Sequence, residues 1–190
     1  MPPYIERTYR DFSSPRHYSR FSVKISETDL YILADSDLTA LASEAVHRYR
    51  SQIEEYIRIR PEFRTSLVPL SGDSLAPDIV REMLDASCRA GVGPMASVAG
   101  AVAEFVGRLL LEKSANVVVE NGGDIYFNVK DDIAVGIFAG TSSLSGRIAL
   151  KIRADQTPLG LCTSSATVGH SLSFGIADAG FQERKFLSVL

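Results

Sequence analysis

The first third of the chain has the periodicity of strands followed by one long helix. Residues 4–10 are rich in β-formers, alternating apolar side chains predict a strand over 18–25, and a short apolar run predicts another over 30–34. From Leu38 apolar residues recur at helical spacing until Pro61, so we expect one helix between them. Five arginines make the end of this helix basic, at positions 48, 50, 58, 60 and 64. Two interpretations of these arginines are possible: a solvated face that complements the helix dipole, or an anion-binding site. The solvated face is favoured.

The middle of the chain is predicted to be a crossover followed by two helices. Residues 65–77 contain two prolines, a glycine and several serines, a composition typical of a linker or crossover loop. Pro77 opens a helix whose apolar stripe ends before Gly91, and Pro94 opens a third helix that runs to about Lys113.

This third helix carries a second stripe, made of small residues at helical spacing. The stripe consists of Ala96, Gly100, Ala103 and Gly107. Glycine inside a helix costs about 1 kcal/mol relative to alanine, so two of them call for a physical reason. Close packing against a sheet is favoured over close approach of a ligand.

The second half of the chain is dominated by short apolar or alternating segments. The predicted strands are 117–119, 125–129, 133–138, 147–152 and 159–162. Strands, then helices, then a run of strands indicate an α+β fold with a mostly antiparallel sheet and packed helices. The length of 190 residues allows one domain, or two lobes that share a core and are joined by the crossover near 65–77.

Composition narrows the class of protein. The chain is 45% hydrophobic and 23% charged, with a formal net charge of −3, so we expect a globular protein without bulk attraction to nucleic acid or to anionic membrane. The sequence has no run of about 18 apolar residues, so no membrane span is predicted. The first residues do not resemble a secretory signal. Two cysteines, Cys88 and Cys162, exclude a disulfide framework, and we expect reduced thiols in the cytoplasm.

The first candidate site segment lies between two predicted strands, at Glu120-Asn-Gly-Gly-Asp124. Asn-Gly and Gly-Gly both suit a hairpin turn that needs positive φ, and this interpretation is favoured. The functional alternative is a backbone that lets a ligand approach closely, with Asp124 holding a hydroxyl or a metal.

The second candidate segment runs from Cys162 to Phe174 and carries six hydroxyl side chains and one histidine, His170. Hydroxyls and glycine N–H groups at a strand end suit phosphate binding, and a polar surface loop is the equally weighted alternative. A nucleophile pair of Cys162 and His170 would need Asp124 or Asp178 to orient the histidine. A serine nucleophile lacks the GxSxG elbow.

Segments 91–107, 117–127 and 160–179, supported by 27–35 and 61–70, together resemble a small, functionally uncharacterised prokaryotic family. That family resembles a branch of the ApbE-like superfamily, whose best-known members are FAD:protein FMN transferases. The resemblance implies a single ApbE-like, T-fold-like α+β domain over 1–190, with a flavin or similar nucleotide in its cleft.

The resemblance also implies roles for residues of the two candidate segments. The matched cofactor-binding positions are Asn121, Gly122, Gly123, Asp124, Thr163, Ser164, Ser165, Gly169 and His170. Ser165 stands where the transferases have glycine. By the same resemblance Asp124 and His170 are the candidate catalytic residues, and Asp178 is the candidate metal ligand.

Three departures from the transferases weaken the expected transfer chemistry. No lysine stands at the start of the 94–107 helix, Ser171 rather than aspartate follows His170, and the chain ends soon after Asp178. The tail after about 179 differs from the continuation expected of relatives, which predicts a truncated or atypical C-terminus. A complete magnesium site is therefore not expected.

These observations predict a flavin- or nucleotide-binding protein in which FMN transfer is weak or absent. Two alternatives stay open: an active FAD:protein FMN transferase-like enzyme, and a non-catalytic structural protein with a vestigial cleft. We also expect a homo-oligomer, because a missing continuation would leave an apolar strand edge to be covered by a partner.

Overall fold

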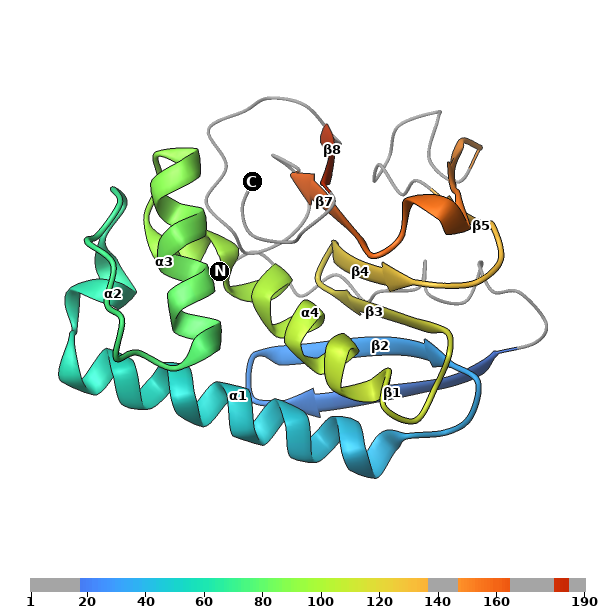
Figure 1. Ribbon diagram of the computed structural model, residues 1–190, viewed down its shortest axis with the longest axis horizontal. Helices are drawn as coiled ribbons and strands as arrows, with labels where there is room; N and C mark the ends of the chain where they lie inside the picture. Colours follow the sequence, from blue (N-terminus) through green and yellow to red (C-terminus); the bar gives the residue numbers. More distant parts are fainter. Residues whose placement is uncertain (1–17, 137–146, 165–179, 185–190) are drawn as a thin grey trace.

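The computed structural model describes residues 18–136, 147–164 and 180–184, and for 164 and 180–184 it describes the backbone alone. Within these ranges the chain forms a six-stranded sheet in which every neighbouring pair is antiparallel, in the order β1-β2-β3-β4-β7-β8 (Figure 1). The strands are β1 (Ser19–Ile25), β2 (Thr28–Ala34), β3 (Val117–Asn121), β4 (Asp124–Asn128), β7 (Leu159–Ser164) and β8 (Gly180–Arg184). The expected α+β class with a mostly antiparallel sheet is confirmed.

Helices pack against one face of this sheet, as Figure 1 shows. They are α1 (Thr39–Ile59), α2 (Glu62–Thr65), α3 (Asp78–Ala90), the 3₁₀ turn η2 (Pro94–Ser97) and α4 (Val98–Leu110). The helix predicted to begin at Pro94 is therefore a 3₁₀ turn followed by an α-helix. Gly91 ends α3 in the left-handed conformation, with φ of +73°, as its position predicted.

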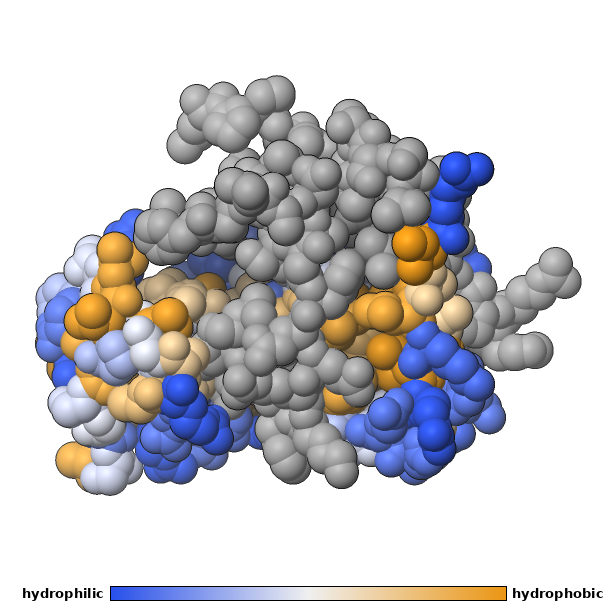
Figure 2. Space-filling model, turned by 90° about the horizontal axis from the view of Figure 1, so that it is seen from above, coloured by the Kyte–Doolittle hydropathy of each residue, from blue (hydrophilic) through white to orange (hydrophobic). Residues whose placement is uncertain are grey.

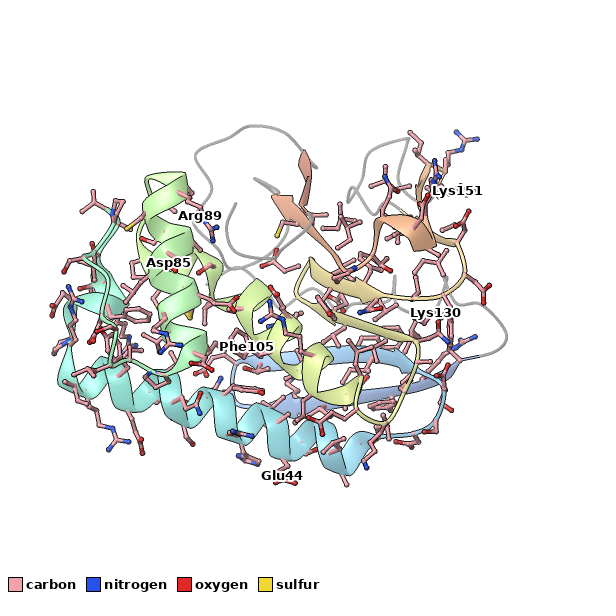
Figure 3. The ribbon with its side chains drawn as sticks, in the orientation of Figure 1. Glu44, Asp85, Arg89, Phe105, Lys130 and Lys151 are labelled. Atoms are coloured by element: carbon pink, nitrogen blue, oxygen red, sulfur yellow. The ribbon has the colours of Figure 1, made fainter. Side chains whose placement is uncertain are left out.

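The core between sheet and helices is built from the apolar stripes of the sequence. Phe105 of α4 packs edge-on against Tyr49 of α1, with ring centroids 5.3 Å apart, and Figure 3 shows Phe105 between the two helices. A Cβ atom at Gly107 would overlap the ring of Tyr126 on β4, so this glycine lets the helix approach the sheet closely. Close packing therefore accounts for Gly107 in the stripe of small residues.

The other face of the sheet is covered by a two-stranded sheet of β5 (Ile133–Gly136) and β6 (Ala149–Ile152). The short 3₁₀ turn η3 (Ala154–Gln156) leads from β6 toward β7. Ile133 and Ile152 join Phe127 and Leu161 of the large sheet in a second buried cluster. The chain between β4 and β7 thus folds back over the strands that it connects.

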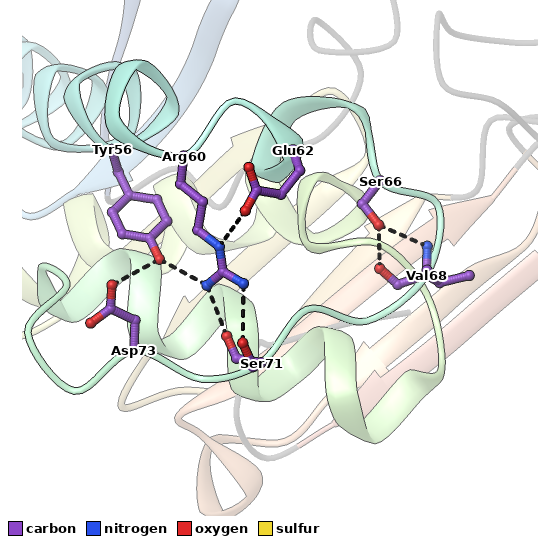
Figure 4. Close-up of polar contacts among 7 residues, drawn as sticks. All are labelled: Tyr56, Arg60, Glu62, Ser66, Val68, Ser71 and Asp73. Atoms are coloured by element: carbon purple, nitrogen blue, oxygen red, sulfur yellow. Dashed lines mark hydrogen bonds and ion pairs between the residues drawn. The ribbon is translucent and has the colours of Figure 1, made fainter.

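The crossover between α2 and α3 is clamped to the end of α1 (Figure 4). The hydroxyl of Tyr56 donates to Asp73 Oδ2 at 3.0 Å, and the guanidinium of Arg60 donates to the carbonyl and hydroxyl oxygens of Ser71 at 3.0 and 3.1 Å. A Cβ atom at Gly93 would overlap the carbonyl of Ser66, so the crossover also packs tightly on the segment before η2. The predicted crossover is thus held by side chains that precede it.

Arg50 and Arg60, two of the arginines near the end of α1, are paired with carboxylates. Arg50 binds Glu27 and Glu54, both at 2.8 Å, and Arg60 binds Glu62 at 2.8 Å. Exposed pairs of this kind contribute little each to stability. Their pairing favours the solvated helix face that the sequence predicted over an anion site.

Apolar surface gathers at the end of the molecule where α2 and the crossover lie (Figure 2). Leu67 and Val68 of the crossover are 69% and 63% exposed. Within the described residues, no single helix is long and apolar enough to cross a membrane. The pair Asp78–Ala90 and Pro94–Leu110 meets that criterion of length and composition only jointly, with a bend of 108° between the two.

The structure also differs from the predicted elements in particular places. Strand β2 begins at Thr28, two residues before the predicted start, and β3 continues to Asn121. Strand β8 was not predicted. The predicted strand over 4–10 lies outside the described residues.

Candidate functional site

The segment Asn121–Asp124 is the hairpin turn between β3 and β4. Gly122 and Gly123 are its central residues and have φ values of +66° and +108°. Positive φ at both central residues is the pattern of a type I′ hairpin, whose backbone matches the twist of the flanking strands. The favoured hairpin interpretation of this motif is therefore confirmed.

The polar backbone atoms of Gly123 are engaged inside the protein. Its N–H donates to Glu120 Oε1 at 3.1 Å, and its carbonyl accepts bonds from the hydroxyl and N–H of Thr163 at 3.0 and 3.2 Å. A Cβ atom at this position would overlap the Thr163 hydroxyl oxygen. The glycine thus docks the hairpin onto β7, and a ligand would meet neighbouring side chains rather than these atoms.

Three polar side chains lie next to one another across neighbouring strands. In the sheet register Asn121 of β3 pairs with Asp124 of β4, and Asp124 pairs with Cys162 of β7. We call these three residues the polar row. On the β1–β2 side the register continues into the apolar residues Val23 and Leu30. Along this row of paired residues, the side chains are therefore apolar in β1 and β2 and polar from β3 onward.

The polar row faces the beginning of α4. The Asn121 amide donates to the carbonyl of Ala99 at 3.0 Å, and the N–H of Gly100 donates to the Asp124 carboxylate. Free N–H groups and the macrodipole give the first turn of a helix a partial positive charge. Asp124 supplies the negative charge that this helix end favours.

Burial raises the pKa of Asp124 from 3.8 to about 6. Hydrogen bonds from the Cys162 thiol and from the Gly100 N–H lower this pKa, and the nearby Glu120 carboxylate raises it. Removal from water is the largest of these effects. At neutral pH the carboxylate is therefore mostly charged, and it titrates close enough to neutrality to take up or release a proton there.

The structure brings several of the residues predicted for the site together. Asn121, Gly122, Gly123, Asp124 and Thr163 meet at the β3–β4 turn and the end of β7. Ser164 is the last residue of β7, and the structure describes its backbone. Ser165, Gly169, His170 and Asp178 lie outside the described residues, so their roles stay predictions.

The part of the chain that the structure describes offers no preformed cation site. No group of three or more His, Cys, Asp or Glu side chains in that part is arranged to hold a metal ion. The polar row itself contributes one carboxylate, one amide and one thiol. The predicted metal ligand, Asp178, is outside the described ranges.

Comparison with known proteins places the chain in a family. The family model described as AbpE bacteria matches residues 10–180. The chain belongs to this family. UPF0280 proteins of Methanococcus aeolicus and Methanocaldococcus jannaschii are 44% and 43% identical to it over 161 and 158 residues. A UPF0280 protein of Methanospirillum hungatei is 43% identical over 162 residues.

These alignments cover 83%, 82% and 84% of the chain and 65%, 64% and 66% of the three relatives. The chain thus spans about 65% of the length of the curated relatives that it matches. The predicted membership of an uncharacterised prokaryotic family is confirmed. The relationship to FMN transferases stays a prediction.

Sequence reasoning did not find the contact between Asp124 and Cys162. It considered Cys162 as a nucleophile paired with His170, with Asp124 or Asp178 as the carboxylate that orients the histidine, and not as a direct neighbour of Asp124. The residues are 38 positions apart, and the register of β4 on β7 pairs them across the folded-back chain. The signal available in the sequence was that both residues lie at strand ends: Asp124 directly precedes the predicted strand 125–129, and Cys162 ends the predicted strand 159–162.

Proposed function

We propose that this protein binds a flavin or a related nucleotide and that its FMN-transferase activity is weak or absent. The observation that supports binding best is the polar row at the N-terminal end of α4. It holds a half-buried, titratable carboxylate between donors from a helix and from a strand. Carboxylates with a raised pKa concentrate at functional sites, because structure seldom requires a charge in such a place.

Charge indicates which part of a nucleotide Asp124 would contact. An ionised carboxylate accepts hydrogen bonds from hydroxyl and ring N–H groups and repels phosphate oxygens. Asp124 therefore suits the sugar, the ribityl chain or the ring. The phosphates would need N–H and O–H donors, which the sequence supplies in the hydroxyl-rich segment that starts at Thr163.

The chemistry of transfer supports the second half of the proposal. A divalent ion, when bound, supplies charge neutralisation at a pyrophosphate, which is worth several kcal/mol in the transition state. The sequence lacks the lysine and the histidine-aspartate pair of the transferases. Loss of even part of that stabilisation slows transfer tenfold for each 1.36 kcal/mol.

Equilibrium binding of FAD and FMN, followed by flavin fluorescence, tests the first half. We expect saturable binding that falls at least tenfold in Asp124→Ala. Asp132→Ala is the matched control, because Asp132 is an exposed carboxylate that pairs with Lys151 at 2.9 Å beside the small sheet. Absence of flavin binding to the unaltered protein would favour the structural alternative and contradict the proposal.

Incubation with FAD, magnesium and an acceptor protein for flavin attachment tests the second half. We expect little or no covalent FMN on the acceptor, measured by mass spectrometry. Robust magnesium-dependent attachment that disappears in Asp124→Ala would show that the protein is an active transferase, and the second half of the proposal would then be wrong.

A further inference from the structure

Cys162 lies directly against the candidate ligand-binding carboxylate. It is the register partner of Asp124, its side chain belongs to the core on the helix side of the sheet, and 8% of its surface is exposed. Its thiol forms a hydrogen bond with the Asp124 carboxylate. Because an ionised carboxylate has no proton to give, the thiol is the donor in this bond.

The thiol completes a cradle around the carboxylate. On the helix side the N–H of Gly100 donates to Asp124, and on the β7 side Cys162 donates to it. The third member of the polar row, Asn121, is tied to the Ala99 carbonyl at 3.0 Å. The carboxylate is thus fixed by two donors from different elements, with a neighbour that is itself held in place.

This contact opposes a nucleophilic role for Cys162. A thiol is reactive as its thiolate, and deprotonation of Cys162 would place a second negative charge beside Asp124. Activated cysteines are found instead next to cations or free helix N-termini. The nearest turn of α4 already receives the Asp124 carboxylate. The geometry therefore suits a hydrogen-bond donor rather than a nucleophile.

We propose that Cys162 is the positioning residue of the site: its thiol holds the Asp124 carboxylate in the orientation and charge state that a ligand hydroxyl or ring N–H requires. The ligand in this statement rests on the proposed function, whereas the effect of Cys162 on Asp124 belongs to the free protein. The groups of the described chain that act on this carboxylate are the Cys162 thiol, the Gly100 N–H and the Glu120 carboxylate.

The first test follows the Asp124 side-chain carboxyl carbon by NMR as pH is varied, without ligand. In Cys162→Ala we expect the midpoint to rise by roughly half to one pH unit, because the ionised form loses a hydrogen bond. In Cys162→Ser, which keeps a donor, the midpoint should lie at or below that of the unaltered protein. Cys88→Ala is the control, since Cys88 is exposed and its thiol is directed to the Leu70 carbonyl.

An unchanged midpoint in Cys162→Ala would overturn the proposal. The serine variant separates the loss of the hydrogen-bond donor from the loss of side-chain packing. If serine shifts the midpoint upward as far as alanine does, the thiol acts through its volume and not through its proton, and the proposal is wrong.

The second test measures FMN affinity of the same variants at pH 6 and pH 8. With a midpoint raised by about 0.7 pH unit, Cys162→Ala should bind roughly threefold more weakly at pH 6 and nearly normally at pH 8. Cys162→Ser should restore the affinity at pH 6. An equal loss at both pH values would contradict the positioning role. If the NMR midpoints move as expected while no form binds FMN, the proposed function fails and the effect of Cys162 on Asp124 stands.

Discussion

Replacement of Asp124 by asparagine should make the protein more stable at neutral pH while it weakens ligand binding. The carboxamide has the shape of the carboxyl group and keeps an oxygen that accepts from the Gly100 N–H and the Cys162 thiol. It has no charge to bury. Asp124→Asn therefore separates the cost of removing the charge from water from the hydrogen bonds around it.

The magnitude and the sign follow from the pKa of Asp124, which is about 6 in the folded protein against 3.8 ordinarily. Between these values the folded state binds more protons than the unfolded state, so stability falls as pH rises. Below pH 3.8 both states are protonated and the penalty is absent, whereas above about pH 6 it is fully present. At 1.36 kcal/mol for each pH unit the penalty is about 3 kcal/mol.

Urea unfolding at several pH values between 4 and 8 measures this effect. We expect Asp124→Asn to raise the free energy of unfolding by up to about 3 kcal/mol at pH 7, with the gain shrinking toward pH 4. Asp132→Asn is the control. Hydrogen bonds from Lys151 and the Ala154 N–H lower the pKa of Asp132, so its ionised form contributes stability above its ordinary pKa and that variant should gain none. A variant Asp124→Asn that is no more stable at pH 7, or a gain that is independent of pH, would refute the reasoning.

Four further predictions concern the rest of the structure. Gly123→Ala should destabilise the fold by about 1–3 kcal/mol in urea unfolding, because φ is +108° and a Cβ atom would overlap Thr163. Tyr56→Phe should cost about 1 kcal/mol, since the crossover loses a hydrogen bond. Iodoacetamide should label exposed Cys88 well before Cys162, as peptide mass spectrometry would show. Sedimentation at micromolar concentration should show an oligomer, in keeping with the exposed apolar crossover.

Each of these has a control or a contradicting result. Gly136→Ala introduces a methyl group into open space and should have little effect, so equal losses at both glycines would contradict the docking of the hairpin on β7. Unchanged stability in Tyr56→Phe would show that the clamp is dispensable. Faster labelling of Cys162 than of Cys88 would indicate a thiolate beside Asp124, and a stable monomer would contradict self-association.

Periodicity predicted the fold class because β1 alternates buried and exposed residues, β2 and β3 are almost continuously buried runs, and α1 and α3 each bury one face. The stripe of small residues correctly anticipated close packing, which Gly107 provides for the ring of Tyr126. Strand β2 starts earlier than predicted because Thr28, a polar residue, is buried there and accepts a hydrogen bond from Arg50 at 2.9 Å. Such long-range pairing leaves no periodic signal.

The sequence predicted that the 121–124 turn and the segment after Cys162 belong to one site, but it did not predict the contact between Asp124 and Cys162. Gly122 and Gly123 predicted the hairpin, because glycine readily adopts the positive φ that the turn needs and this preference is local. The meeting of Asp124 with Cys162 depends on which strands pair and in which register, after an excursion of the chain through β5 and β6. The hydrogen bond from the Gly100 N–H of α4 to Asp124 likewise follows from packing between elements far apart in sequence.

The pH dependence of flavin affinity tests the central claim most directly. Fluorescence titration of FMN from pH 5 to pH 8 should show affinity that rises through about pH 6, where Asp124 ionises, and then levels off. Asp132→Asn should follow the same curve, and Asp124→Asn should bind weakly at every pH. Binding to Asp124→Asn that equals binding to the unaltered protein across this range, or no binding by either, would contradict the account.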